Sequence, residues 1–503
     1  MTAMLAAGFT ALDYGVLVTY LAGMMLLGAW FSRRENSAED YFLAGRRIPW
    51  WAAGVSIFGT ALSALTFMGV PARSYGGDWQ LMLQDNAPLL LVPVVALVYI
   101  PFYRRLNLST AYDYLQRRFN LACRWVGSLY YILFQFCRMA VILTLTAIAL
   151  QVATGWDIYW CIAIMGALAA VYTVAGGIEA VIWTDLAQVT VLLGGAIFAV
   201  AMIAWNTEGG LGGIISAGAG AGKISLGRWS EFCTRDKGPA IWLILLGGAI
   251  GGFGTYTTDQ GVVQRYLSTA DAKSAGKALW TTAILGLPSG ILFYFFGTAL
   301  WSWFGRTGQA PALGVNGNAI VPWFVVHHLP TGISGLVIAG IFAAAMSSLD
   351  SGINAISSAV HNDFVERFVK LPDRSAVRLA RLVSILCAEV AILLAMLLAA
   401  SPAFNEVLLN IFFKMLFFFA GPLAGLFAVG IFTRRATGLS ALAGVAAGLG
   451  VNSYVVLFTP LPGQTYAPIG LAVTFTVSWA LGLIPQPRKP LAAMTIHTGC
   501  DRS

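Results

Sequence analysis

The chain has 503 residues, of which 58% are hydrophobic and only 10% are charged. Soluble globular domains are about 45–50% apolar and about 25% charged, so the composition excludes that class. The net charge of +8 does not indicate a nucleic-acid partner, because the basic residues stand in short clusters between apolar runs, and the six scattered cysteines predict neither a disulfide framework nor a zinc site.

Apolar segments close to the length of about 20 residues that crosses a bilayer recur along the whole chain. The N-terminal stretch has no basic region before its first apolar run, so this run is expected to be a retained helix and not a cleaved signal. The sequence predicts an all-α polytopic membrane protein with about 13 transmembrane helices. These lie at 13–32, 50–70, 84–103, 126–151, 158–176, 180–205, 239–265, 278–304, 333–359, 379–400, 407–432, 437–458 and 467–485.

Most lysines and arginines fall in the loops on one side of these segments, for example Arg33 and Arg34, or Arg434 and Arg435. Cytoplasmic loops carry an excess of such residues, which predicts an N-terminus outside and a C-terminus in the cytoplasm. Arg73 is one of the few basic residues assigned to the outer side.

Two of the segments are expected to be interrupted by glycine and helix-poor sequence. The second, WWAAGVSIFGTALSALTFMGVP, begins at Trp50, and the seventh contains LLGGAIGGFGTYTTDQ, which ends at Gln260. Four segments lie between them, so they head two successive groups of five helices, and an odd group size gives the groups opposite orientation. Broken helices at matching positions of an inverted repeat point to the central site of a transporter. The alternative is that glycine is simply common in membrane helices.

Charges within the apolar segments each need a reason, since a charge at mid-bilayer costs about 2.5–3.5 kcal/mol on insertion scales. They are Asp85, Arg138, Asp185, Asp259, Asp350, Glu389 and Lys414. Lys414 and Glu389 are candidates for a structural pair or for side chains that snorkel to the membrane surface. The Arg138 guanidinium can donate two parallel hydrogen bonds to a carboxylate, or it can form an ion pair with an acid such as Asp85.

Hydroxyl side chains gather in two of these segments. Ser63 and Thr66 lie three residues apart in the second segment, where they suit either a polar solute or their own helix backbone. Ser347, Ser348 and Ser351 share one arc of the ninth segment beside Asp350. Such oxygens suit a small hard cation, and Asp185 is a second acid that would complete the site. The alternatives are helix packing through serine, and two carboxylates that share a proton.

Several longer motifs give the chain a resemblance to the sodium:solute symporter family. They are DYFLAGRR, AGGIEAVIWTD, DQGVVQRYLS and AAAMSSLDSGINAISS, and the likeness extends to the loop at Arg434–Leu439. Within the family the chain is most similar to bacterial sodium/sialic acid symporters, through SALTFMGVPARSY, FCRMAVILTLT and VIWTD.

The resemblance implies a five-plus-five inverted-repeat (LeuT-like) core with broken first and sixth core helices. It divides a single membrane transport domain, 1–503, into four parts. These are an extra N-terminal helix at 13–32, a ten-helix core at 50–432, two C-terminal helices at 437–485 and a cytoplasmic tail at 486–503. It also implies a bacterial inner membrane as the location.

Site residues follow from the same resemblance. A first sodium site is expected from the backbone carbonyls of Gly59, Leu62 and Ala344 with the hydroxyls of Ser347 and Ser348. A second sodium site is expected from Asp185, Ser347, Asp350 and Ser351. The substrate-binding residues are expected to be Ser63, Thr66 and Arg138, with Leu81, Asp85 and Phe253 or Tyr256 as further candidates.

Two positions depart from the sialic acid carriers. Asp350 stands where those carriers have serine, which favours a second cation site or proton coupling. Asp85 stands where they have a substrate-binding glutamine. An acid there is expected either to pair with Arg138 and weaken carboxylate binding, or to favour a solute that bears hydroxyls or an amine.

The predicted function is sodium-coupled symport of a small polar solute, sialic acid or a related sugar acid, by alternating access. One or two sodium ions are the coupling ions, and neither an organic cofactor nor an obligatory protein partner is expected. The alternatives are sodium-coupled uptake of a neutral sugar, polyol or amino acid, and a proton-coupled carrier of the same fold. The chain is not expected to be an enzyme, since the four histidines fall in predicted loops or the tail.

Overall fold

The computed structural model describes residues 9–32, 44–106, 111–173, 178–227, 239–308, 317–365, 368–369, 373–484 and 495. This part of the chain is built from helices, with one isolated parallel bridge between Ile48 and Thr269. The predicted tail at 486–503 falls almost entirely outside the described residues. The α-helices are α1 (Ala11–Ser32), α3 (Trp50–Ala61), α4 (Ala64–Gly76), α5 (Met82–Asn86), α6 (Val92–Val94), α7 (Ile100–Leu106), α8 (Asp113–Arg118), α9 (Leu121–Thr154), α10 (Ile158–Thr173), α11 (Ile178–Trp205), α12 (Gly210–Gly220), α13 (Ile241–Thr258), α14 (Gln260–Leu267), α15 (Ala272–Thr307), α16 (Ile320–His328), α17 (Ile333–Ala359), α18 (Asp373–Ala400), α19 (Leu408–Phe432), α20 (Gly438–Phe458) and α21 (Tyr466–Leu481).

Helices occupy all of the predicted apolar segments. Within the described residues, nine helices are long and apolar enough to cross a membrane, and the bent pair α3–α4 makes a tenth. One of the nine is the run Met82–Leu106, in which 3₁₀ and π turns join α5, α6 and α7. The all-α membrane class is therefore confirmed, whereas the exact number of thirteen spans stays a prediction.

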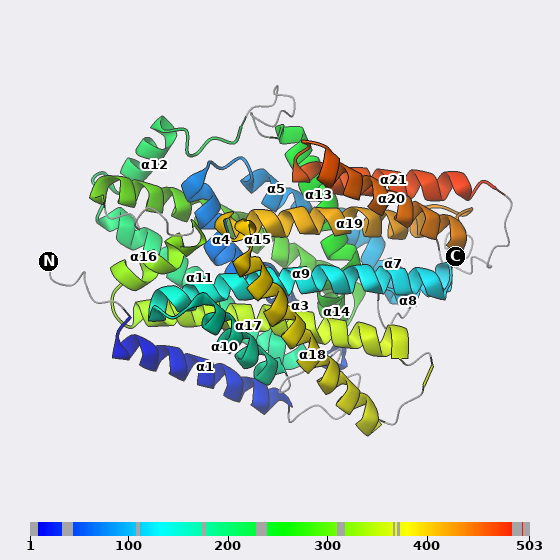
Figure 1. Ribbon diagram of the computed structural model, residues 1–503, viewed down its shortest axis with the longest axis horizontal. Helices are drawn as coiled ribbons and strands as arrows, with labels where there is room; N and C mark the ends of the chain where they lie inside the picture. The colour runs from blue at the N-terminus through cyan, green and yellow to red at the C-terminus, as the bar shows by residue number, and fades with distance from the viewer. Residues whose placement is uncertain are drawn as a thin grey trace.

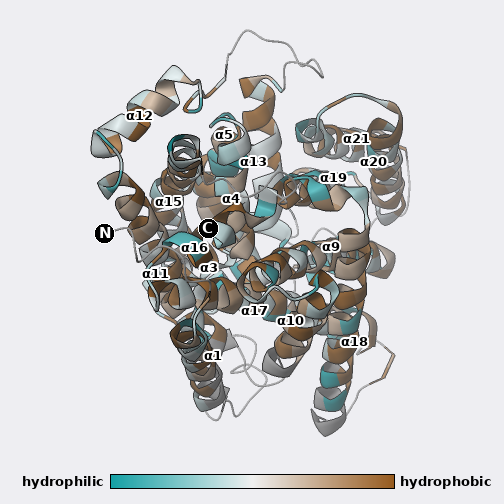
Figure 2. Ribbon diagram, turned by 60° about the vertical axis from the view of Figure 1, so that its left-hand side comes forward, coloured by the Kyte–Doolittle hydropathy of each residue, from teal (hydrophilic) through white to brown (hydrophobic). Residues whose placement is uncertain are grey.

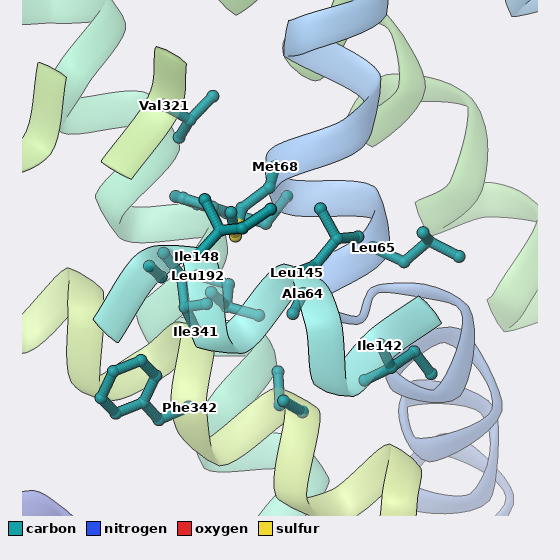
Figure 3. Close-up of a cluster of buried hydrophobic side chains, with 14 of the residues drawn as sticks. Ala64, Leu65, Met68, Ile142, Leu145, Ile148, Leu192, Val321, Ile341 and Phe342 are labelled. Atoms are coloured by element: carbon teal, nitrogen blue, oxygen red, sulfur yellow. The ribbon is translucent and has the colours of Figure 1, made fainter. Parts of the chain in front are cut away.

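The helices α9, α17 and α19 run close to the longest axis of the molecule and α18 crosses obliquely, with α12 and α16 at one end and α7 and α8 at the other (Figure 1). Hydrophobic residues predominate along most of them (Figure 2). The run Ile333–Val365, which contains α17, is the most enclosed of these helices, with 89% of its most apolar 18 residues buried. Ile341 of α17, Met68 of α4 and Ile148 of α9 belong to one buried hydrophobic cluster (Figure 3).

The peripheral helix α1 is fastened to the start of α17 by one buried carboxylate. Asp13 Oδ1 accepts hydrogen bonds from Gly332 N, Ser334 Oγ and Gly335 N at 2.7, 2.6 and 3.0 Å. Its Oδ2 accepts from Thr10 N at 2.9 Å. Asp13 thus caps its own helix and α17 together, and it places a negative charge at two positive helix N-termini.

The glycine-rich segments are interrupted at residues other than their glycines, which corrects the sequence interpretation. α3 ends at Ala61 and α4 begins at Ala64 with a bend of 53°, so Leu62 and Ser63 form the break. The glycines lie inside the helices and serve close packing. A Cβ at Gly54 would lie 2.6 Å from Thr281 of α15, and one at Gly252 would collide with Pro88.

Candidate functional site

The first helix break frees carbonyl groups that would otherwise be bonded within a helix. The last helical bond of α3 runs from Leu62 N to Phe58 O at 2.8 Å, and beyond it Thr60 O accepts from Arg138 Nη2 at 3.2 Å and Ala61 O from Thr66 Oγ1 at 2.5 Å. The C-terminal end of α3 carries partial negative charge, so the Arg138 guanidinium stabilises it.

The second interruption separates α13 from α14 at Asp259. This residue has extended backbone (φ −73°, ψ 113°), and its Oδ1 accepts from Gly261 N at 2.8 Å as the N-cap of α14. The predicted break in the seventh segment is therefore a single-residue interruption that follows the glycines. The carbonyls at the end of α13 are satisfied from the neighbouring segments, Thr257 O by Tyr103 and Thr258 O by Tyr112, each at 2.8 Å.

A chamber of about 240 Å³ lies between the two interrupted helices and α5, α9, α15 and α19. Of the predicted substrate residues, it is lined by Ser63, Thr66, Asp85, Arg138 and Tyr256. Its wall also holds the aromatic rings of Phe134, Phe293, Phe412, Phe413 and Phe417.

Two predicted wall residues lie elsewhere, which is a correction. Leu81 precedes α5 as its N-cap and does not line the chamber, because the next turn presents Gln84 and Asp85 instead. Phe253 packs edge-on against Tyr99 with ring centroids 5.1 Å apart. Of the pair Phe253 and Tyr256, the chamber-lining residue is therefore Tyr256.

The hydroxyls of Ser63 and Thr66 face the chamber from the break, and both contact the backbone. Ser63 Oγ accepts from Leu65 N at 3.2 Å as the N-cap of α4, and Thr66 Oγ1 donates to Ala61 O at 2.5 Å. Both hydroxyls thus make hydrogen bonds to the backbone of their own segment, as the second of the two alternatives predicted. Ser63 still has its proton to donate, and Thr66 its lone pairs to accept.

Arg138 extends from α9 to the point where both interruptions meet. Besides Thr60 O, its guanidinium contacts Asp259, with Nη1 3.8 Å from Oδ2, and its side chain is 14% exposed. The structure therefore pairs Arg138 with Asp259, and the expectation that Arg138 pairs with Asp85 is wrong.

Asp85 has a different cation. Arg73 Nη1 of α4 lies 3.1 Å from Asp85 Oδ2, and Tyr294 Oη of α15 donates to the same oxygen over 2.9 Å. Arg73 Nε also donates to Asn410 of α19 at 2.9 Å. Arg73 is only 6% exposed, so it lies buried within α4 beside Asp85.

Two of the residues expected to form the first sodium site, Gly59 and Ser347, lie beside Asp185 of α11. Ser347 Oγ of α17 donates to Asp185 Oδ1 at 2.5 Å, and a Cβ built on Gly59 would lie 3.4 Å from Asp185 Cβ. Leu62, Ala344 and Ser348 are all buried beside these residues on α17 or at the break. The set supplies hydroxyl and carbonyl oxygens, which are hard ligands that fit sodium.

Two of the residues expected to form the second sodium site contact one buried arginine. Arg265 of α14 lies 3.4 Å from Asp185 Oδ2 and donates to Ser351 Oγ at 3.1 Å and to Ser56 Oγ at 2.9 Å. Arg265 and Asp185 are both 1% exposed. Asp350 is also buried and accepts from Asn354 at 3.0 Å.

Lys414 and Glu389 do not pair with each other, and both are exposed. Lys414 contacts Glu406 at 3.1 Å on an exposed surface, and not Glu389, which is exposed on α18.

Three further residues line the chamber that the sequence patterns did not indicate, namely Tyr294, Gln84 and Asn86. They lie in continuous apolar or short helical sequence, and no local pattern distinguishes them.

Comparison with known proteins agrees with this architecture. A model of the sodium:solute symporter family matches residues 41–448. The sodium/sialic acid symporter SiaT of Proteus mirabilis is 38% identical over 443 residues, which are 87% of this chain and 88% of that protein. NanT of Aliivibrio fischeri, also a sodium/sialic acid symporter, is 35% identical over 476 residues, 94% of this chain and 93% of that protein.

Solved structures give the same result. A sodium-coupled sialic acid symporter in a substrate-bound outward-open state superposes with a TM-score of 0.86 at 34% identity, covering 96% of this chain and 99% of that one. A nucleobase-cation-symport-1 family transporter, at 15% identity and a TM-score of 0.60, shares the fold. The predicted LeuT-like fold class is thereby confirmed. The chain belongs to the sodium:solute symporter family.

Proposed function

We propose that the protein takes up sialic acid or a related sugar acid by sodium-coupled symport with alternating access. The observation that carries the proposal is the position of Arg138, whose guanidinium reaches into the chamber where both interrupted helices meet. Two relatives that span nearly the whole chain are sodium/sialic acid symporters, which supports the same substrate.

Each group in the chamber has a role in this proposal. Arg138 binds the substrate carboxylate through two parallel N–H donors, and the N-terminal end of α4 at Ser63 favours the same negative charge. Ser63 and Thr66 bind further oxygens of the solute. Asp85, already neutralised by Arg73, accepts a hydrogen bond from a substrate hydroxyl, and Tyr256 closes one wall.

Sodium enters as cargo and binds to the oxygens around the first helix break. Gly59, Leu62 and Ala344 supply carbonyls and Ser347 and Ser348 supply hydroxyls for one ion. Asp185, Ser347, Asp350 and Ser351 supply the oxygens for a second. One charge that crosses 100 mV supplies about 2.3 kcal/mol, or about fiftyfold accumulation of a solute, and a second ion squares that electrical factor.

The remaining parts of the proposal concern placement. The chain lies in a bacterial inner membrane with its N-terminus outside and its C-terminus in the cytoplasm, as the basic loops favour. The helix at 13–32 is peripheral, 50–432 is the ten-helix core, and 437–485 adds two helices before a cytoplasmic tail. Transport by this chain involves no enzymatic step, no organic cofactor and no second protein.

Uptake of labelled sialic acid into proteoliposomes tests the proposal, with sodium and choline gradients side by side. We expect sodium-dependent accumulation that is lost in Arg138→Ala and kept in Lys414→Gln, a charge change at an exposed position. Absence of uptake, together with sodium-dependent thermal stabilisation by a neutral sugar, would keep the symporter and exclude the sugar acid. Accumulation driven by a proton gradient without sodium would favour the proton-coupled alternative.

A further inference from the structure

Arg138 and Asp259 face each other at one end of the chamber. Arg138 comes from α9 and Asp259 from the interruption between α13 and α14, with 3.8 Å between Nη1 and Oδ2. Tyr131, Gln135 and Arg138 share one face of α9, because they follow each other at helical spacing. Gln135 Nε2 donates to Tyr131 Oη at 2.6 Å, and Tyr131 Oη donates to Asp259 Oδ1 at 3.3 Å.

Asp259 also stands at a junction between two cavities. A smaller cavity of about 30 Å³ lies against the chamber, lined by Tyr130, Tyr131 and Thr258 among others. The two cavities share Phe134, Thr255, Asp259 and Leu416. A solute that occupies the chamber therefore meets Asp259 on the wall nearest to the smaller cavity.

The chemistry of the pair sets two anions in competition for one guanidinium. A substrate carboxylate needs the same N–H donors of Arg138 that face Asp259. Asp259 does not depend on Arg138, since its carboxylate is held at the positive N-terminus of α14 by Gly261 N at 2.8 Å and by Tyr131. It therefore keeps two hydrogen-bond donors when it loses its cation.

We propose that Asp259 is the counter-ion of Arg138 in the empty chamber, and that a substrate must carry a carboxylate to displace it. Asp259 is then a specificity-determining residue. It weakens the binding of acids by the work of displacement, whereas a neutral solute leaves the contact between Arg138 and Asp259 in place. The inference rests on the proposed carboxylate-binding role of Arg138.

The test compares the binding of sialic acid with that of its methyl ester in saturating sodium, by isothermal titration calorimetry on the purified full-length chain. Asp259→Asn removes the charge and keeps a good N-cap. We expect the acid to bind about tenfold more tightly to this variant while the ester is unchanged, so that the ratio of the two dissociation constants shifts about tenfold. Asp271→Asn is the matched control, because Asp271 caps α15 in the same way, at 2.7 Å from Ser274 N, outside the chamber.

The same preparation separates a failure of this inference from a failure of the proposed function. Equal changes for acid and ester, or weaker acid binding, would assign Asp259 a capping role only and overturn the inference. If the wild-type chain does not bind sialic acid at all, the proposed substrate is wrong, and formate becomes the probe. Thermal stabilisation by formate should then appear in Asp259→Asn and vanish in Asp259→Asn/Arg138→Gln, and its failure to appear would overturn the inference. Asp259→Ser, a neutral N-cap, replaces the asparagine variant if that variant does not fold.

Discussion

Ser347 of α17 donates a hydrogen bond to Asp185 of α11 over 2.5 Å, and this bond directly links the two proposed cation sites. Ser347 belongs to both sets of ligands, and Asp185 belongs to the second. On the other side, Asp185 contacts Arg265 of α14 and Ser56 of α3. Four helices thus meet at one carboxylate.

Replacement of Ser347 by alanine should damage sodium coupling more than any other single hydroxyl loss in this region. The change removes one ligand from each proposed site and a hydrogen bond from Asp185, so the sodium concentration for half-maximal uptake should rise at least about tenfold. Sodium titration of uptake measures this shift. Ser357→Ala, on the same helix, should leave the sodium dependence unchanged, and equal effects of the two variants would contradict the assignment.

Asp185→Asn should destabilise the protein by leaving the Arg265 guanidinium buried without its carboxylate. The removal of one partner of a buried ion pair costs about 3–5 kcal/mol. The double variant Asp185→Asn/Arg265→Gln should recover most of this loss, because it leaves no unpaired charge. Thermal unfolding in detergent follows both variants, and a double variant as unstable as the single one would show that the pair is not coupled.

Gly252 should not tolerate a methyl group. A Cβ at this position would overlap Pro88 in the neighbouring helical run, and rigid backbone lies directly behind that proline ring. Overpacking of this kind costs about 1–3 kcal/mol. Gly76→Ala is the control, because a Cβ there meets no atom within 4 Å. Thermal unfolding should separate the two variants, and a Gly252→Ala protein as stable as Gly76→Ala would mean that these helices can move apart freely.

Asp13→Asn should loosen the attachment of α1 to α17. The substitution replaces a carboxylate that accepts from two helix N-termini with a neutral amide, and such a charge–dipole contact contributes about 0.3–1 kcal/mol per terminus, more when it is buried. We expect a lower melting temperature without a change in substrate affinity. Asp157→Asn is the control, since Asp157 accepts from Tyr159 N at 2.9 Å at an exposed helix start. A comparable loss in both variants would assign the effect to capping in general.

The sequence predicted the helices well because each must bury about 20 apolar residues in lipid, and that requirement is visible locally. The cluster of Ser347, Ser348 and Ser351 beside Asp350 was recognisable for a similar reason, since helical spacing alone places these residues on one arc. The two interruptions were located only approximately. Glycine was the visible signal, whereas the chain breaks at Leu62–Ser63 and at Asp259, where neighbouring groups bind the freed backbone.

The sequence did not predict which arginine pairs with which carboxylate. Arg73, Arg138 and Arg265 carry the same side chain, and each faces a different carboxylate, Asp85, Asp259 and Asp185 respectively. Residues 12, 121 and 80 positions apart along the chain meet only when the helices pack. The sequence by itself therefore determined the membrane class, the family and which residue types carry the chemistry. Tertiary structure decided which charge neutralises which, because a buried ion pair depends on a contact of a few ångströms that no local pattern encodes.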